Sequence, residues 1–197
     1  MQAAITWILA LLTYAAPPDR LSDAMPGWEE SPEARRARYE AIAADIAATV
    51  YAPDAPVLYG GARGRAHTAA LLVAVAVLES GLAADVDRGP CYRGRDGRGP
   101  RCDSGRAFGL WQVHDPSVAG DRRAAARRAL RMMRSSFAWA HGTRDYNWSP
   151  AERETHRLDT YAGGSNARAH KLGAARLAFA DRLAARPGAP RDSEVAP

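Results

Sequence analysis

The sequence has few cysteines, no long apolar run and no common cofactor motif, and each absence excludes a class of protein. Its two cysteines, Cys91 and Cys102, cannot complete a four-ligand zinc site, because no histidine lies at finger-like spacing from them. The apolar segment from Ala3 to Leu12 is shorter than the about 20 residues that a membrane-spanning helix needs. No HExxH pair, nucleophile elbow, P-loop or dinucleotide fingerprint is present. We therefore expect no cofactor, no metal and no transmembrane helix beyond the N-terminal segment.

The bulk composition fits one domain with short extensions. Of the 197 residues, 47% are hydrophobic, which is enough for an ordinary core, although much of that fraction is alanine. The formal net charge is +5, and the basic residues are almost all arginine. A basic surface suits an anionic partner such as nucleic acid, anionic lipid or an acidic wall polymer. The alternative is compositional bias of the genome, with no functional meaning.

The N-terminal segment is typical of an export signal. Residues 1–16 contain an apolar stretch as long as the apolar core of a signal peptide, followed by the small-x-small cleavage pattern Thr13-Tyr14-Ala15. No Lys or Arg precedes the apolar core, so a short apolar helix or an anchor is the alternative. We predict a signal peptide at 1–16, a linker at 17–30 and a periplasmic or extracellular location.

The remainder predicts an all-α domain over residues 31–186. Ser31 and Pro32 mark a helix start, and apolar residues then recur at helical spacing as far as Val50. The run 66–80 is apolar nearly all round, which indicates a buried helix, because the alternative, a buried strand, usually spans only about 4–8 residues. We also expect helices at 121–139, 149–161 and 166–184, an irregular segment at 83–107 and a disordered tail at 187–197.

Glu79 is an unusual residue at the end of that apolar helix. A carboxylate there faces the negative end of the helix dipole and lies among apolar neighbours. Both effects favour the protonated form, which a general acid needs near neutral pH. The alternative from these residues alone is that Glu79 points to solvent.

Three short motifs surround this glutamate in a recognisable order. Glu79-Ser80-Gly81 is followed by Gly109-Leu110-Trp111-Gln112 and then by Tyr161-Ala162-Gly163-Gly164 before the last helix. Over about residues 66–185, this pattern resembles the lytic transglycosylase and goose-type lysozyme group of the lysozyme-like superfamily. The resemblance implies a lysozyme-like helical fold and cleavage of peptidoglycan glycan strands at the MurNAc-GlcNAc β-1,4 bond.

The resemblance also assigns roles to individual residues. Glu79 matches the catalytic glutamate, and Tyr161 matches a tyrosine that hydrogen-bonds near it. The matching cleft and turn residues are Ser80, Phe108, Gly109, Trp111 and Gln112. Trp111 replaces the usual methionine and offers a face for stacking on a sugar. Ala162-Gly163 replaces Asn-Ala, so an amide that supports the cleft is missing.

A second carboxylate decides which reaction the resemblance implies. With Glu79 alone, the muramyl 6-hydroxyl attacks and leaves a 1,6-anhydro end, whereas hydrolysis by inversion needs a second carboxylate as base. Asp103 stands ahead of the Gly-Leu-x-Gln motif at an offset similar to that of an aspartate in goose-type lysozymes. Asp85, Asp87 and Asp96 are further candidates, and turn capping is the alternative role for all four. The transglycosylase is our first hypothesis, and the hydrolytic lysozyme using Glu79 and Asp103 is the second.

The two cysteines lie in a Gly/Pro/Arg-rich stretch within the irregular segment. In an exported chain they predict a disulfide, Cys91–Cys102, which would stabilise the loop by about 3 kcal/mol. Two unrelated thiols are the alternative. The loop between Glu79 and Gly109 is longer than is usual in the lytic transglycosylase and goose-type lysozyme group, and we expect it to form one wall of the cleft.

A basic helical face completes the candidate features, namely Arg122, Arg123, Arg127, Arg128, Arg131 and Arg134. No recognition motif accompanies it, so we expect no nucleic acid partner; a solvated face is the first interpretation and contact with anionic wall polymer the second. The expected partner is peptidoglycan, bound by a monomer. A non-catalytic wall-binding protein on the same fold and a basic nucleic-acid-binding protein remain the alternatives.

Overall fold

The computed structural model describes residues 1–20, 24–88, 102–143, 146–164 and 166–195. Within them the chain is helical and contains no strand, apart from an isolated antiparallel bridge between Phe108 and Val113. The predicted all-α class is therefore confirmed. The elements are α1 (Gln2–Ala15), α2 (Pro32–Val50), α3 (Gly64–Ser80), α4 (Ala84–Arg88), α5 (Cys102–Gly105), η1 (Pro116–Val118), α6 (Arg122–Gly142), α7 (Pro150–Thr155), α8 (Ala167–Ala184) and η2 (Asp192–Glu194).

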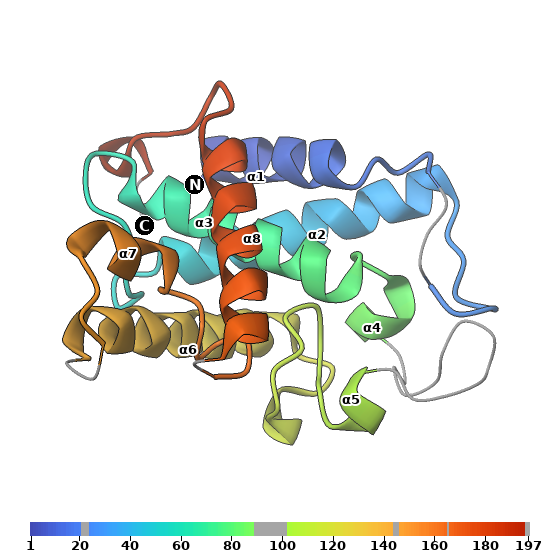
Figure 1. The fold of residues 1–197 in the computed structure, drawn as a ribbon. Coiled ribbons are helices and arrows are strands. Elements are labelled where there is room, and N and C mark those ends of the chain that lie inside the picture. The colour runs from blue at the N-terminus through green and yellow to red at the C-terminus, as the bar shows by residue number, and fades with distance from the viewer. Residues whose placement is uncertain (21–23, 89–101, 144–145, 165, 196–197) are drawn as a thin grey trace.

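Helix α3 is the centre of the fold. Its residues from Ala69 to Ala76 are fully buried, as the apolar run predicted. It packs against α8, which crosses it in front in Figure 1, and against α1 and α2. Gly81 ends α3 with a φ of 58°, a left-handed conformation that glycine adopts without steric cost. Glu79 is thereby fixed at the last turn of a rigid, buried helix.

Local capping groups set where the other long helices begin. The Ser31 side chain accepts from the backbone N–H of Ala34 at the start of α2, and Asp121 and Asn166 cap α6 and α8 in the same way. These starts agree with the sequence expectations. Helix α7 begins at its predicted Ser149 cap but ends at Thr155, not at 161 as expected. Residues 156–162 form hydrogen-bonded turns instead.

The predicted domain boundaries are too narrow at both ends. Residues 2–15 form α1, whose Ile8, Leu11 and Leu12 are fully buried against α2 and α3. In the segment 17–30, Glu30 accepts hydrogen bonds from Arg38. The packed unit therefore includes the predicted signal peptide and linker, and removal of residues 1–16 stays a prediction.

The C-terminal tail is packed as far as residue 195, so its predicted disorder is wrong for those residues. The backbone N–H of Arg65 donates to the Asp192 carboxylate at 3.2 Å, and the N–H of Asp192 donates to the carbonyl of Ala62 at 2.8 Å. The Arg186 guanidinium lies 3.7 Å from the centre of the Tyr14 ring. Contacts to segments far away in the sequence thus hold a stretch whose own composition indicates disorder.

The predicted irregular segment contains two short helices, α4 and α5. Residues 89–101 lie outside the described residues, and Cys91 is among them. The Cys91–Cys102 disulfide therefore stays a prediction. In the described part of the chain, no helix combines the length and the apolar character that crossing a bilayer requires.

Candidate active site

A cleft of about 590 Å³ brings the three predicted motifs together. Its lining includes Glu79 from the end of α3, Asp103 from α5 and Tyr161 from the turns before α8. Trp111 and Gln112 of the Gly-Leu-Trp-Gln turn line it as well. Segments separated by tens of residues in the sequence therefore meet at one concave surface, and the Glu79 carboxylate is part of its lining.

Glu79 forms an ion pair with Arg176 of α8. The Arg176 Nη2 donates to Oε1 of Glu79, and the two side chains are 7% and 21% exposed, respectively. The Nε and Nη1 groups of Arg176 are buried and have no hydrogen-bond partner among the described residues. Arg176 thus supplies a desolvated cation beside the carboxylate, which the helix-end argument for a protonated Glu79 did not anticipate.

Tyr161 fixes one wall of the cleft. Its hydroxyl donates to the carbonyl of Trp111 at 2.8 Å, and its backbone N–H donates to Ser136 Oγ. Burial, together with the negative charge of Glu79, raises the pKa of Tyr161, although Arg176 opposes this. Tyr161 therefore remains a neutral phenol that joins the turn before α8 to the Trp111 turn.

The Gly-Leu-Trp-Gln motif forms a tight turn with strained backbone. Gly109 has a φ of +65°, and a Cβ there would lie 3.3 Å from that of Ala125 in α6. Gln112 has a φ of 49°, and its side-chain amide donates to the carbonyl of Gly109 at 2.9 Å. The turn thus holds Gln112 at the cleft in a conformation that residues other than glycine rarely adopt.

Three residues assigned to the cleft from the sequence have structural roles. Trp111 is 1% exposed and donates from Nε1 to the carbonyl of Leu72, so its ring has no face free for sugar stacking. Ser80 is buried and bonds to the carbonyl of Ala76 at 2.6 Å. Phe108 pairs with Val113 through backbone bonds, and neither Ser80 nor Phe108 lines the cleft. Gln112 thus lines the cleft, whereas Trp111, Ser80 and Phe108 have the structural contacts described above.

Asp103 is the predicted second carboxylate that reaches the cleft. It is 42% exposed and pairs with Arg106 at 2.8 Å and with His114 at 3.3 Å. Asp85 is fully buried and accepts a hydrogen bond from the backbone N–H of Met25, so its role is structural. Asp87 is likewise buried, and Arg122 donates two hydrogen bonds of 2.8 Å to its carboxylate. Asp96 lies outside the described residues.

Two arginines that sequence reasoning did not assign to the cleft also line it, Arg168 and Arg176, together with His114 from the end of the Gly-Leu-Trp-Gln turn. A signal for Arg176 was available, because it falls on the same helical face as Phe179 and Leu183. A cation on a core-facing stripe needs an anionic partner. The sequence did not identify that partner as Glu79, since the two residues lie 97 positions apart.

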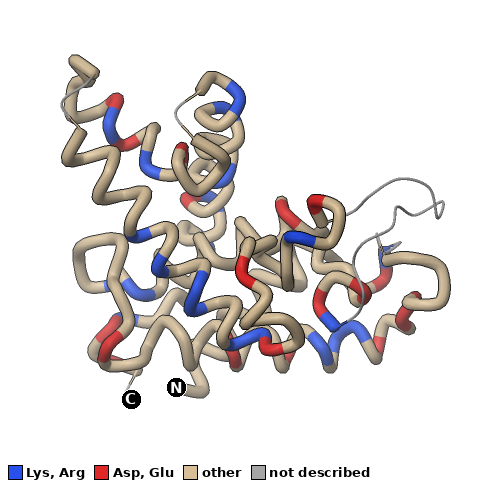
Figure 2. The backbone as a smooth tube through the Cα atoms, turned by 90° about the horizontal axis from the view of Figure 1, so that it is seen from below, with Lys and Arg blue, Asp and Glu red and all other residues tan. Residues whose placement is uncertain are grey.

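Three of the six arginines of the predicted basic face pair with acidic residues. Arg122 and Arg123 bind Asp45, and Arg128 lies 3.3 Å from Asp115. Figure 2 shows acidic and basic residues interspersed along the chain and not segregated on one face. This arrangement fits a solvated, ion-paired surface better than a nucleic-acid interface.

Comparisons with protein-family models, with curated proteins and with solved structures give no match for this chain. The assignment of a function therefore rests on the cleft and its residues.

Proposed function

We propose that this protein cleaves the glycan strands of peptidoglycan at the MurNAc-GlcNAc β-1,4 bond, as a lytic transglycosylase that leaves 1,6-anhydro-MurNAc ends. The observation that carries this proposal is the cleft in which Glu79, Gln112 and Tyr161 meet, each from one of the three motifs. Such a cleft, with one carboxylate at the end of a buried helix, suits acid/base chemistry on a polymer bond.

In this mechanism Glu79 acts first as an acid and then as a base. Its protonated carboxyl donates the proton to the glycosidic oxygen, and the bond from that oxygen to C1 of the muramyl sugar breaks. The carboxylate left on Glu79 then accepts the proton of the muramyl 6-hydroxyl while O6 bonds to C1. The adjacent Arg176 guanidinium stabilises the carboxylate formed between the two steps.

Hydrolysis is the second candidate, because Asp103 lines the same cleft as Glu79. As base, Asp103 would take a proton from a water that attacks C1 from the opposite face of the sugar. Arg106 donates a hydrogen bond to the Asp103 carboxylate, and His114 Nε2 lies 3.3 Å from it, so both contacts orient Asp103 at the cleft. The product would then carry a reducing end in place of the anhydro ring.

The remaining parts of the proposal concern the setting of the enzyme. We propose that it works as an exported monomer, in the periplasm or outside the cell, where peptidoglycan is found. A Cys91–Cys102 disulfide would close the loop that continues into α5, and an oxidising compartment would preserve it. The loop would then hold Asp103 at the rim of the cleft.

The Glu79→Gln variant tests the proposed activity. The amide keeps the size of the side chain but cannot donate an acidic proton, so release of soluble fragments from purified peptidoglycan should fall by about 10²-fold or more. Glu40→Gln, at an exposed glutamate on α2, is the matched control and should retain full activity. Circular dichroism verifies that both variants fold. Unchanged activity of Glu79→Gln would contradict the mechanism, and an inactive unaltered protein that still binds peptidoglycan would indicate a non-catalytic binding role.

Mass spectrometry of the fragments separates the two reactions. Anhydro ends that persist in Asp103→Asn indicate the transglycosylase, whereas reducing ends that disappear in the same variant indicate the hydrolase.

A further inference from the structure

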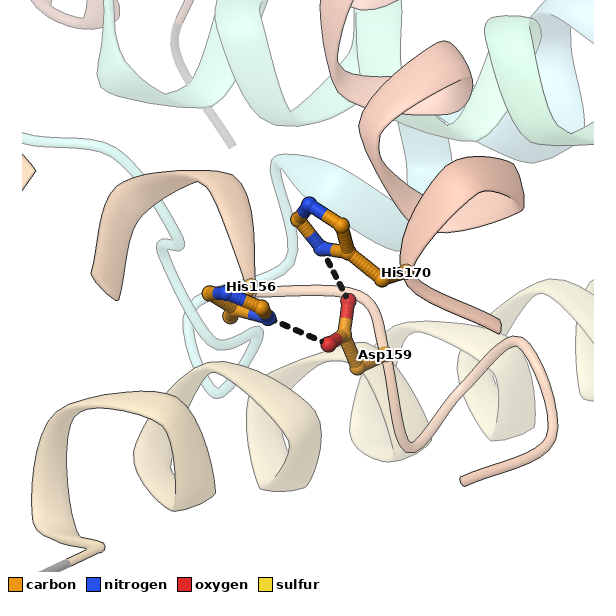
Figure 3. A group of neighbouring side chains, drawn as sticks. All are labelled: His156, Asp159 and His170. Carbon is orange, nitrogen blue, oxygen red and sulfur yellow. Dashed lines mark hydrogen bonds and ion pairs between the residues drawn. The ribbon is translucent and has the colours of Figure 1, made fainter. Parts of the chain in front are cut away.

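Two histidines and one aspartate converge beside α8, away from the Glu79 carboxylate. His156 follows α7, Asp159 lies in the next turn, and His170 is in the first turns of α8 (Figure 3). The Nδ1 of His156 lies 2.6 Å from Oδ2 of Asp159, and the Nδ1 of His170 lies 3.3 Å from Oδ1. One potential ligand atom from each residue lies within 4.8 Å of the other two.

The carboxylate of Asp159 is deeply buried, and a buried anion is costly unless a cation compensates it. Its side chain is 2% exposed, and both ion pairs found for it within the described residues are to the two imidazoles. Neutral imidazoles supply hydrogen bonds but no net charge. Two arginines of the preceding segment bind elsewhere: Arg153 donates to backbone carbonyls, and Arg157 pairs with Glu154.

We propose that His156, Asp159 and His170 form a binding site for a late first-row divalent cation, with Zn²⁺ as its representative. Two imidazole nitrogens and one carboxylate oxygen are a ligand set typical of zinc, with water in the fourth position. Ca²⁺ and Mg²⁺ do not fit, because they prefer all-oxygen ligands. The cation would compensate the charge of Asp159 directly.

The ligands are close to the spacing that such an ion requires. Zinc bonds of about 2.0–2.2 Å place tetrahedral ligand atoms about 3.3 Å apart, within the span observed here. The two imidazoles are stacked, with ring centres 4.0 Å apart and planes at 26°, so a shared ion requires rotation of a ring about its Cβ–Cγ bond. The His156 ring is stacked on Trp148 as well as on His170, so the rotation falls to His170, which is 37% exposed and offers a route for the cation.

Such an ion would brace the turn that forms part of the cleft. His156 and Asp159 belong to the segment that continues to Tyr161, and His170 belongs to the helix that carries Arg176. A shared cation would join these two segments by metal bonds in place of hydrogen bonds. The inference does not depend on glycan cleavage, since metal binding is measured without substrate.

The experiment uses tag-free full-length protein with ZnCl₂ as the probe. Equilibrium dialysis with elemental analysis should find one zinc per chain, and zinc should raise the unfolding temperature by several degrees. His170→Ala should weaken the zinc affinity by roughly 10- to 100-fold or more and abolish the thermal shift. This variant should fold, because the side chain is partly exposed. His67→Ala is the matched control, since His67 also pairs with an aspartate, Asp181, but outside this three-residue cluster.

Several outcomes would overturn the proposal. They are the absence of zinc binding by the unaltered protein, equal zinc binding and thermal shift in His170→Ala, and an equal response to CaCl₂ or MgCl₂. In the second case, the zinc would be bound elsewhere on the chain. A loss of binding in His67→Ala as large as that in His170→Ala would also contradict the assignment.

Discussion

At the scale of single residues, the contact between Glu79 and Arg176 determines how the proposed acid is held. A carboxylate at the end of an apolar helix is unfavourable when ionised, and the sequence alone therefore favoured its protonated form. The guanidinium from α8 supplies the missing counter-charge. It is itself incompletely hydrogen-bonded, because Nε and Nη1 are buried without partners in the described part of the chain. The pair thus leaves the guanidinium only partly hydrogen-bonded beside the Glu79 carboxylate.

Arg176→Met tests the energetic weight of this pair. Removing the guanidinium leaves Glu79 without its cation, so we expect the free energy of unfolding to fall by about 1–3 kcal/mol, below the full value for a buried pair because Glu79 is 21% exposed. Urea unfolding measures the loss. In the Glu79→Gln background, the same substitution should cost clearly less, since no anion is left unpaired. Equal losses in the two backgrounds would show that the pair is not energetically coupled.

At the scale of elements, the sequence predicted what short-range signals determine. Ser31-Pro32, Ser149-Pro150 and Asn166 mark real helix starts, because a cap is formed by residues within one turn of it. The sequence also placed Glu79 and Tyr161 at one cleft, through the order of the motifs. Contacts across the fold were not predictable in this way. Trp111 donates to the carbonyl of Leu72, a contact that the resemblance did not indicate. The tail is held by contacts such as that of Asp192 with the backbone N–H of Arg65, against the indication of its local composition.

The early end of α7 has the same origin. Residues 149–161 have a helix start and no proline to stop the helix, but their last part forms turns that direct Asp159 and Tyr161 toward α8 and the cleft. Gly173 of α8 permits this close approach. A Cβ at position 173 would lie 3.1 Å from the backbone carbon of Leu158 and 3.2 Å from Oδ1 of Asp159.

Gly173→Ala should therefore be destabilising, although alanine normally favours a helix. The new methyl group meets backbone that cannot move freely, and we expect a loss of about 1–3 kcal/mol in the free energy of unfolding. Gly142→Ala in α6 is the matched control, because a Cβ there meets nothing within 4 Å, and it should be neutral or stabilising. Thermal unfolding of the two variants provides the comparison. A Gly173→Ala variant as stable as the control would show that α8 does not pack tightly on this turn.

At the scale of the whole molecule, residues 1–16 have two candidate roles that exclude one another in a single chain. A signal peptide is removed after export, whereas α1 contributes fully buried side chains to the core. Figure 1 shows α1 lying along α2, and the C-terminal segment returns to α1, where Arg186 covers Tyr14. The same helix thus holds together the two ends of the described chain.

Deletion of residues 1–16 decides between these roles. Burial of side chains such as Ile8, Leu11 and Leu12 contributes about 1.5–3 kcal/mol each, and a domain of this kind has only about 5–15 kcal/mol of net stability. We therefore expect the shortened chain to lose cooperative thermal unfolding and to bind hydrophobic dyes. Leu11→Ala is a milder perturbation, which should lower the free energy of unfolding by about 2–5 kcal/mol and leave the chain folded. If the shortened chain instead unfolds cooperatively at the temperature of the full chain, α1 is dispensable, and its predicted role as a removable export signal is favoured.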